Sequence, residues 1–269
     1  MKKSERETEK IHLELSKMLI SIDEICRENR IRYYITAGTL LGAVREGGFI
    51  PWDDDCDVVI PRRDFCKFVK IMQKRGSDFF YFQDSRCERH YPFAFAKIRS
   101  KRVGGRESGV IWQGLGGGCY IDVFPLDKCP ENTRRATRFF KLSELFTSLL
   151  VAKCGGECGY KKRSARLIFS LLSLLHGRVI ALFREAVRIY YSMTSNGARL
   201  ATVYGSYGYP RECYEAEWFS EECRLKFEGH TLSAPVGYEE ILKSMYGDYM
   251  TPHAESERRA HFAPGKEKQ

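Results

Sequence analysis

The sequence predicts an α+β fold in which a core of alternating helices and strands carries an inserted, basic helical subdomain. Short β-rich runs alternate with helical segments over residues 1–131, and a mixed pattern returns after residue 210. Between them, residues 132–210 are mostly helical in pattern and rich in Lys and Arg. We therefore divide the chain into a core (1–131), a helical insertion (132–210) and a C-terminal segment (211–269) that completes the core.

The first elements of the core follow from spacing and from glycine positions. Apolar residues recur at intervals of three and four from Ile11 to Ile25, which predicts an amphipathic helix. A short strand is expected at Tyr33–Ile35. The Gly38-Thr39 turn then opens a second helix, Leu40–Val44, which Gly47-Gly48 ends.

The remainder of the core is predicted as strands separated by one helix and one loop. Residues 56–60 form a β-rich run that Pro61 ends, and Asp64 is placed to cap a helix with Phe65, Phe68, Val69 and Met72 on one side. Further strands are expected at 79–83, 93–98 and 120–124, with a glycine-rich loop at 104–118 before the last and Pro125 after it.

The insertion is expected to hold about three helices between residues 133 and 193, because glycines interrupt the helical pattern. The C-terminal segment is predicted to hold a strand near 225–227 and a helix at 238–245. The most apolar stretch, Leu167–Leu175, is too short to cross a bilayer.

Composition and charge narrow the class of protein. The chain has 269 residues, of which 43% are hydrophobic, so it is long enough and apolar enough to bury a core. Its net charge is +9, and residues 132–190 alone hold twelve Lys or Arg against three acids. This regional excess indicates either a solvated helical face or contact with an anionic partner such as a phospholipid leaflet, a glycan or a nucleic acid.

Cysteine usage and the N-terminus predict a cytoplasmic protein with reduced thiols. Ten cysteines are too few for a disulfide scaffold of this length, and no secretory signal precedes the first helix. Cys154 and Cys158 have no second pair at zinc-finger spacing, so we favour ordinary cysteines there over a structural zinc.

Three carboxylates form the candidate catalytic site. Asp55 and Asp57 are two residues apart at the start of a predicted strand, so both side chains project from the same face. Two anions this close require a cation, and carboxylate oxygens favour Mg²⁺ or Mn²⁺. Asp122 lies in another apolar strand and is the candidate third ligand of a metal site suited to phosphate chemistry.

The Gly38-Thr39 turn is a candidate phosphate-binding element. It follows a strand, opens a helix and precedes the acid pair by fewer than twenty residues. Backbone N–H groups and the positive end of a helix dipole at such a turn suit a phosphate oxygen, although simple capping of the helix would produce the same pattern.

Several runs of the sequence resemble a known family. Residues 35–45 read Ile-Thr-Ala-Gly-Thr-Leu-Leu-Gly-Ala-Val-Arg, and residues 48–57 read Gly-Phe-Ile-Pro-Trp-Asp-Asp-Asp-Cys-Asp. Together with Lys97-Ile98-Arg99, the run 120–127, and the ending Tyr246–Met250 followed by Arg258 and His261, they resemble the LicD family of phosphocholine transferases. The resemblance is weakest over residues 132–210.

The resemblance implies a nucleotidyltransferase-like fold, a small mixed β-sheet flanked by helices, in which Gly38 and Thr39 match the phosphate turn. Asp55, Asp57 and Asp122 match the acids that hold divalent metal. It also implies transfer of phosphocholine or a similar phospho-alcohol from a CDP-alcohol to a cell-surface glycan, such as lipopolysaccharide or teichoic acid, or to its lipid-linked precursor. No nucleic-acid partner is expected on this reading.

The remaining candidates are assigned by the chemistry of the transfer. Arg45, Lys97 and Arg99 are candidates to neutralise the phosphates of the substrate, and Asp53 or Asp54 is the candidate general base. The basic helices are candidates for peripheral docking on the cytoplasmic leaflet. Two alternatives stay open: a nucleotidyltransferase acting on RNA, protein or a small molecule, and a non-catalytic basic binding module.

Overall fold

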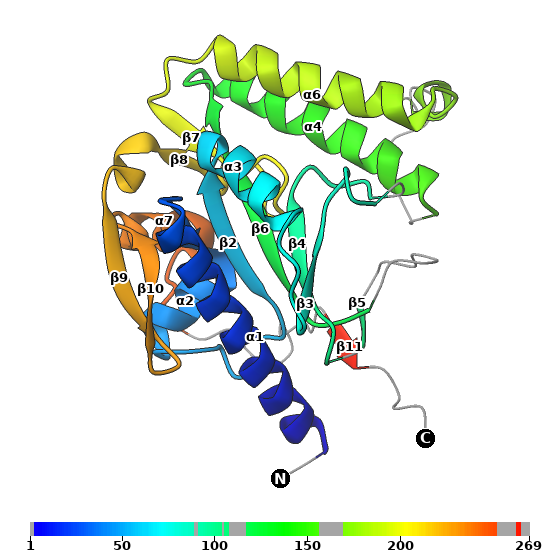
Figure 1. Ribbon diagram of the computed structural model, residues 1–269. Helices are drawn as coiled ribbons and strands as arrows, with labels where there is room; N and C mark the ends of the chain where they lie inside the picture. The colour runs from blue at the N-terminus through cyan, green and yellow to red at the C-terminus, as the bar shows by residue number, and fades with distance from the viewer. Residues whose placement is uncertain are drawn as a thin grey trace.

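The computed structural model confirms a mixed α+β architecture (Figure 1). It describes residues 3–88, 91–103, 105–107, 117–155, 169–251 and 262–264. Its largest sheet has the order β1-β2-β6-β4-β3, and β7 and β8 continue it from the far end of β6. Only β2 and β6 run parallel; the other pairs are antiparallel. The strands are β1 (Tyr34–Ile35), β2 (Cys56–Pro61), β3 (Phe80–Gln83), β4 (Ala96–Ser100), β6 (Tyr120–Cys129), β7 (Arg199–Ala201) and β8 (Cys213–Glu215).

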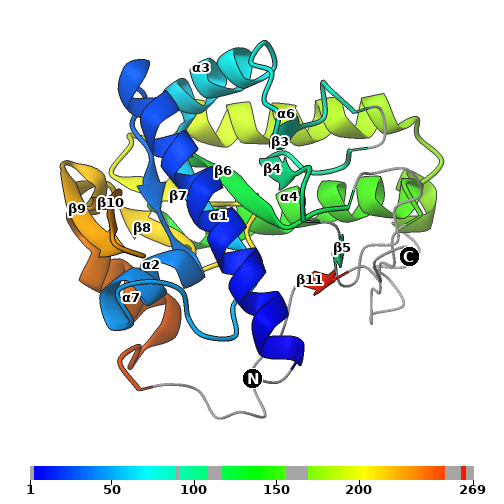
Figure 2. The same ribbon diagram turned by 60° about the horizontal axis from the view of Figure 1, so that its bottom comes forward.

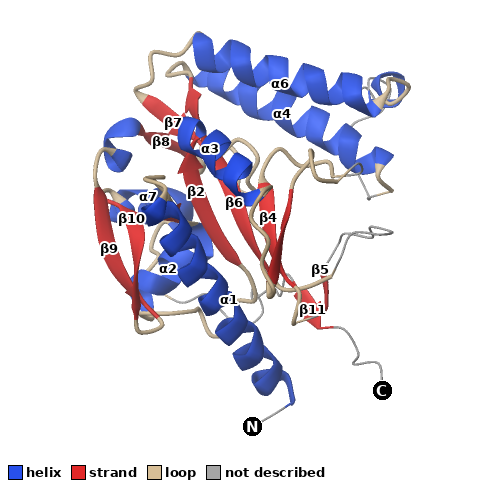
Figure 3. Ribbon diagram, in the orientation of Figure 1, coloured by secondary structure: helices blue, strands red, loops and turns tan. Residues whose placement is uncertain are grey.

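Three helices pack around this sheet, as Figure 3 shows by secondary structure. The predicted N-terminal helix is confirmed as α1 (Lys3–Glu28), and it crosses the sheet against β4 and β6. All six of its predicted core positions are at most 5% exposed: Ile11, Leu15, Met18, Leu19, Ile22 and Ile25. The helices α2 (Ala37–Arg45) and α3 (Arg62–Met72) follow β1 and β2 respectively and are also confirmed, but α2 begins at Ala37, so Gly38 and Thr39 lie in its first turn and not before it.

Two details of the core differ from the prediction. Pro125 does not end its strand, because β4 pairs only with residues 120–123 of β6 and β7 only with 127–129, so the proline falls between the two antiparallel partners. Asp64 does not cap α3. It lies inside the first turn, and its carboxylate instead accepts hydrogen bonds from the backbone and side chain of Arg32.

The described part of the insertion contains two long helices, α4 (Thr133–Lys153) and α6 (Gly177–Met193). Figures 1 and 2 both show them lying side by side, and in Figure 1 they lie above the sheet. Asn132 begins α4 by accepting hydrogen bonds from the backbone of Arg134 and Arg135. The chain then returns to the core through β7, which pairs with β6 although it lies within the predicted insertion. No helix among the described residues is long and apolar enough to span a bilayer.

The C-terminal segment packs against the edge of the core near β1 and α2. The predicted strand and helix are confirmed as β9 (Glu222–Phe227) and α7 (Tyr238–Tyr246); β10 (His230–Pro235) pairs with β9, and the short helix η1 (Ala216–Phe219) precedes them. A second small sheet joins β5 (Gly105–Glu107) to β11 (Phe262–Pro264), so the predicted glycine-rich loop contains a strand. The rest of that loop, except 117–118, lies outside the described residues, as does Cys158.

Candidate active site

Strand register aligns two of the predicted acids and one predicted cation in a row across the sheet. Asp57 on β2 is the register partner of Asp122 on β6, and Asp122 is the register partner of Lys97 on β4. Side chains at register positions of neighbouring strands lie on one face, about 5 Å apart. The sheet itself therefore holds Asp57, Asp122 and Lys97 together; we call these three residues the charged row.

The charges around the row disfavour the ionised form of Asp57. Burial raises the pKa of Asp57 well above its ordinary value, and the charges of Asp55, Asp122 and Asp53 raise it further, while Lys97 lowers it. Three neighbouring carboxylates thus oppose the ionised form of Asp57 against one cation that favours it. A group of this kind gains most from an additional positive charge.

Lys97 is engaged by Asp122 and by aromatic rings. Its Nζ donates to Oδ1 of Asp122 at 2.6 Å, and only 1% of the residue is exposed. The same nitrogen lies 3.8 Å from the ring centroid of Tyr120, with the rings of Phe95 and Phe93 at 5.4 and 5.9 Å. Lys97 therefore supplies the partner that an acid inside an apolar strand was expected to need.

Arg99 lies on the same face of β4, two residues beyond Lys97, and is also buried. Its Nε donates to Oε1 of Gln83 at 2.6 Å, and its guanidinium carbon lies 4.9 Å from the ring centroid of Tyr120. Both predicted cations of β4 thus lie on the face of the sheet that carries the charged row. Lys97 pairs directly with Asp122, and Arg99 lies beside that pair.

The Gly38-Thr39 turn is joined to the acids by direct contacts. Thr39 Oγ1 accepts a hydrogen bond from the backbone N–H of Asp57 at 2.9 Å. A Cβ at Gly38 would lie 2.6 Å from Oδ2 of Asp53, so any larger residue there would displace that carboxylate from the start of α2. Ala37, just before it, has a left-handed φ of 47°, a strained conformation for a non-glycine residue.

The acids that crowd together most closely are consecutive in sequence. Asp53, Asp54 and Asp55 bring carboxylate oxygens within 4.8 Å of one another. The predicted triad of Asp55, Asp57 and Asp122 does not reach that mutual spacing. Burial raises the pKa of Asp53 well above its ordinary value, with further contributions from Asp55 and Asp54. The candidate metal ligands therefore extend from this triplet to the charged row.

Arg45 is separated from the acids by the length of α2. It occupies the last residue of the helix, whereas Gly38 occupies the first turn, a separation of about 10 Å along the axis. Its guanidinium donates to Oε1 of Glu46 at 2.8 Å and to the carbonyl of Tyr249 at 3.3 Å. The structure thus places Arg45 in a different group from Lys97 and Arg99, and its predicted role at the phosphates has no support from its position.

A small cavity of about 30 Å³ beside Asp57 contains polar residues that the sequence did not indicate. Glu212 lines it, is 4% exposed, and has its pKa raised to about 8 by burial. Tyr207 also lines it, and its hydroxyl lies 3.1 Å from that of Tyr246. Tyr246 lies in the segment Tyr246–Met250 that resembles the LicD family, and this resemblance was the one sequence signal that pointed to a residue of this group. Glu212 and Tyr207 stand in or next to the weakly matching segment. Arg258 and His261 lie outside the described residues.

Comparison with known proteins indicates the class of protein to which this chain is similar. Residues 30–139, which carry the Gly38-Thr39 turn and all the predicted acids, match the family model described as LicD/FKTN/FKRP, nucleotidyltransferase domain. Over 240 residues the chain is 25% identical to the lipopolysaccharide cholinephosphotransferase LicD of Haemophilus influenzae, covering 88% of this chain and 89% of that protein. Residues 30–139 therefore resemble the nucleotidyltransferase domain of the LicD family, and similarity to a LicD protein extends over most of the chain.

Shorter matches join the chain to two uncharacterized proteins. It is 43% identical over 67 residues to one from Rickettsia typhi and 44% identical over 60 residues to one from Rickettsia prowazekii. These stretches cover 25% and 22% of this chain and 22% and 23% of the two proteins. Neither match carries information on activity.

Proposed function

We propose that the protein is a metal-dependent transferase that moves phosphocholine, or a related phospho-alcohol, from a CDP-alcohol to a hydroxyl of lipopolysaccharide or a similar glycan. The observation that carries this proposal is the charged row, which lies in a chain similar along most of its length to a lipopolysaccharide cholinephosphotransferase. Aligned acids with adjacent buried cations suit phosphoryl transfer, where catalysis depends on positioning and charge neutralisation.

The donor set fits a hard divalent cation. All candidate ligands are carboxylate oxygens, which Mg²⁺ and Mn²⁺ prefer, and Asp57 is surrounded by like charges that such an ion would offset. Asp55, Asp57 and Asp122 would hold the ion, although among the described residues it is Asp53, Asp54 and Asp55 that bring carboxylate oxygens within 4.8 Å of one another. When bound, Mg²⁺ would neutralise the pyrophosphate of the donor and the charge that develops on the bridging oxygen.

The chain's own residues would orient the substrates. The acceptor hydroxyl attacks the phosphorus that bears the alcohol, the bond from that phosphorus to the bridging oxygen breaks, and CMP leaves with that oxygen. Asp53 or Asp54 would accept the proton of the attacking hydroxyl. Arg99 and Lys97 would stabilise negative charge on the transferred group, and Thr39 holds the backbone of Asp57 in place.

The test is release of CMP from CDP-choline in the presence of Mg²⁺ and lipopolysaccharide, with CDP-ethanolamine, CDP-ribitol and CDP-glycerol as other donors. Asp57→Asn is expected to abolish CMP release while the far-ultraviolet circular dichroism spectrum stays unchanged. Asp64→Asn is the matched control, because Asp64 is a carboxylate that pairs with Arg32 outside the site. Near-normal turnover by Asp57→Asn contradicts the metal assignment.

The two alternatives have distinct products. A nucleotidyltransferase would release pyrophosphate from a nucleoside triphosphate, because the α-phosphorus is attacked. A binding module would release neither CMP nor pyrophosphate and would bind RNA tightly with strong salt dependence. Either outcome would contradict the proposed phospho-alcohol transfer and support the corresponding alternative.

We also propose that the outer side of α6 docks peripherally on an anionic membrane at its inner face, where a lipid-linked acceptor would be presented. Exposed apolar side chains fall within about 120° of arc around this helix at 100° per residue. They are Val179, Leu182, Phe183, Ile189, Tyr190 and Met193, between 37% and 80% exposed. Exposed basic residues of the adjoining α4, Arg134, Arg138 and Lys141, complement anionic headgroups.

Flotation with vesicles containing phosphatidylglycerol tests this docking. Wild type is expected to float with the vesicles at low salt, and the double change Leu182→Gln and Phe183→Gln is expected to stay in solution. Val236→Gln removes an exposed apolar side chain from the end of β10 and serves as control. Wild type that remains unbound at low salt, or equal flotation of the double variant, contradicts the proposal.

A further inference from the structure

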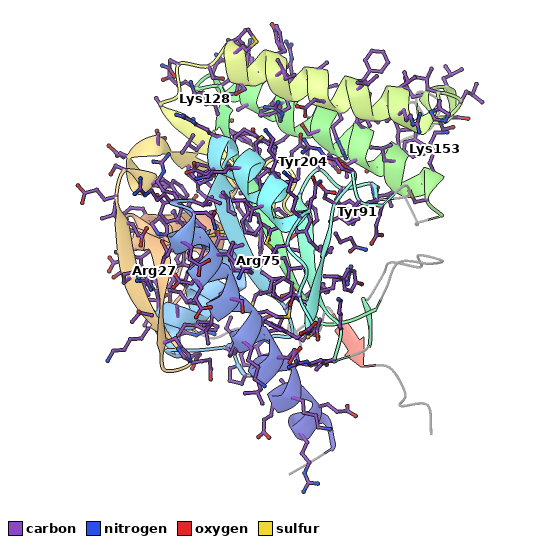
Figure 4. The ribbon with its side chains drawn as sticks, viewed as in Figure 1. Arg27, Arg75, Tyr91, Lys128, Lys153 and Tyr204 are labelled. Atoms are coloured by element: carbon purple, nitrogen blue, oxygen red, sulfur yellow. The ribbon has the colours of Figure 1, made fainter. Side chains whose placement is uncertain are left out.

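A cavity of about 290 Å³ lies where the insertion meets the core. Its wall combines α3, the segment between β3 and β4, and the inner side of α6. Four arginines line it: Arg62, Arg86, Arg184 and Arg188. Figure 4 shows the region under the two long helices, where Tyr91 and Tyr204 are labelled. The volume is close to the lower limit of small-molecule sites, about 300 Å³.

Two of these arginines are neutralised by carboxylates. Arg62 donates two hydrogen bonds to Asp127, at 2.7 and 2.5 Å, and Asp127 is fully buried. Arg188 pairs with Glu185 and lies 3.6 Å from Asp127. The carboxylate of Asp84, which also lines the cavity, accepts hydrogen bonds from backbone N–H groups of its own turn and from the side chain of Gln73.

Of the other two arginines, Arg86 is exposed to solvent, whereas Arg184 is buried. It is only 6% exposed, and no carboxylate of the described residues lies within 4.0 Å of its nitrogens. Its Nη1 donates to the carbonyl of Pro92 and, at 3.5 Å, to Oγ1 of Thr147, and its guanidinium carbon lies 5.8 Å from the ring centroid of Tyr204. Its Nε and Nη2 groups have no acceptor within the described part of the chain. A buried charge without a counterion is costly, so this arginine lacks an anion.

We propose that this cavity is an anion site that binds a phosphate monoester, with Arg184 as its central ligand and Arg62 and Arg188 as flanking donors. Guanidinium groups match phosphate in charge and in the geometry of their N–H donors. Phosphate would supply the counterion that Arg184 lacks.

The site is separate from the charged row but next to it. Phe95 lines the cavity, and the same ring lies 5.4 Å from Nζ of Lys97, which pairs with Asp122. The proposed phosphate site requires neither the metal nor the donor of the transfer reaction. Phosphate binding and turnover can therefore succeed or fail independently.

The experiment measures binding of inorganic phosphate and of glucose 6-phosphate to the metal-free full chain by calorimetry and by thermal denaturation, with glucose as the uncharged control. Both phosphates are expected to bind and to raise the melting temperature further as their concentration increases above Kd, and glucose is expected to do neither. Tighter binding of glucose 6-phosphate than of phosphate would identify a phosphorylated sugar as the preferred source; equal binding would identify free phosphate.

Variants separate a ligand role from a structural role. Arg184→Gln is expected to weaken phosphate binding by about tenfold or more, because it removes a charge-assisted hydrogen bond, and to melt no lower than wild type without phosphate. Arg178→Gln, an exposed arginine of the same helix, is expected to bind as wild type. Glu185→Gln is expected to bind phosphate more tightly. Absence of phosphate binding by wild type in the millimolar range, or unchanged binding by Arg184→Gln, overturns the proposal.

Discussion

Replacing Asp127 with asparagine is expected to destabilise the whole protein more than any exposed charge change. Asp127 is fully buried in β6, where it accepts two hydrogen bonds from Arg62 of α3 and lies 3.6 Å from Arg188 of α6. Asparagine keeps the size of the side chain but removes the charge that neutralises both arginines. The perturbation therefore isolates electrostatics from packing.

The magnitude follows from the burial of this cluster. Removing one member of a buried, hydrogen-bonded ion pair costs about 3–5 kcal/mol, because the remaining charge stays desolvated without a partner. Each kcal/mol lowers the melting temperature of a chain of this order of size by about 2–4 °C. We therefore expect a decrease of roughly 6–20 °C in the melting temperature.

Urea denaturation and differential scanning calorimetry at pH 7 measure this loss. Arg75→Gln is the matched control, because Arg75 and Glu28 form an ion pair at 3.5 Å whose side chains are 45% and 63% exposed. Such a pair is expected to contribute at most about 1 kcal/mol. If Asp127→Asn loses no more stability than Arg75→Gln, the buried cluster does not hold the insertion to the core.

Three further changes test other parts of the fold. Gly42→Ala would place a Cβ 2.3 Å from the carbonyl oxygen of Gly48, and chemical denaturation should show a loss of about 1–3 kcal/mol. Glu212 holds its proton up to about pH 8 when folded but only to about 4.5 when unfolded, so stability should fall as the pH rises between these values. Glu212→Gln should remove that part of the fall in urea titrations with EDTA, and an unchanged slope would contradict it. Lys97→Met leaves Asp122 without its cation and should cost about 3–5 kcal/mol in the same assay at neutral pH; an unaltered midpoint would contradict the pairing.

Local sequence patterns predicted the individual helices and strands, because each of these depends on residues that are close in sequence. The spacing of apolar residues located α1, and the β-rich run after the aspartates located β2 with its acids. Strand register, however, depends on which strands pair, and the sequence does not contain that information locally. That Asp57 is aligned with Asp122 and Lys97 became visible only in the folded sheet.

The differences between the sequence predictions and the structure, including residues that the sequence did not indicate, share a physical cause, which is tertiary context. Pro125 ends an isolated strand in principle, but here β6 changes partners at that point and continues. Arg45 stands within seven residues of Gly38 in sequence, yet the rise of the helix carries it away from the acids. Glu212 and Tyr207 reach the cavity beside Asp57 from a region 150 residues or more away in sequence.

The charged row has a consequence for how such a protein can diversify. Its spacing depends on backbone hydrogen bonds between three strands, so insertions or deletions in the loops that surround it leave the distances between its carboxylates and its ammonium group unchanged. Acceptor preference can therefore vary through the loops and the helical insertion while the reacting groups keep their geometry. A slip of one residue in the pairing of β2 with β6, by contrast, would turn one carboxylate to the opposite face and dismantle the row in a single step.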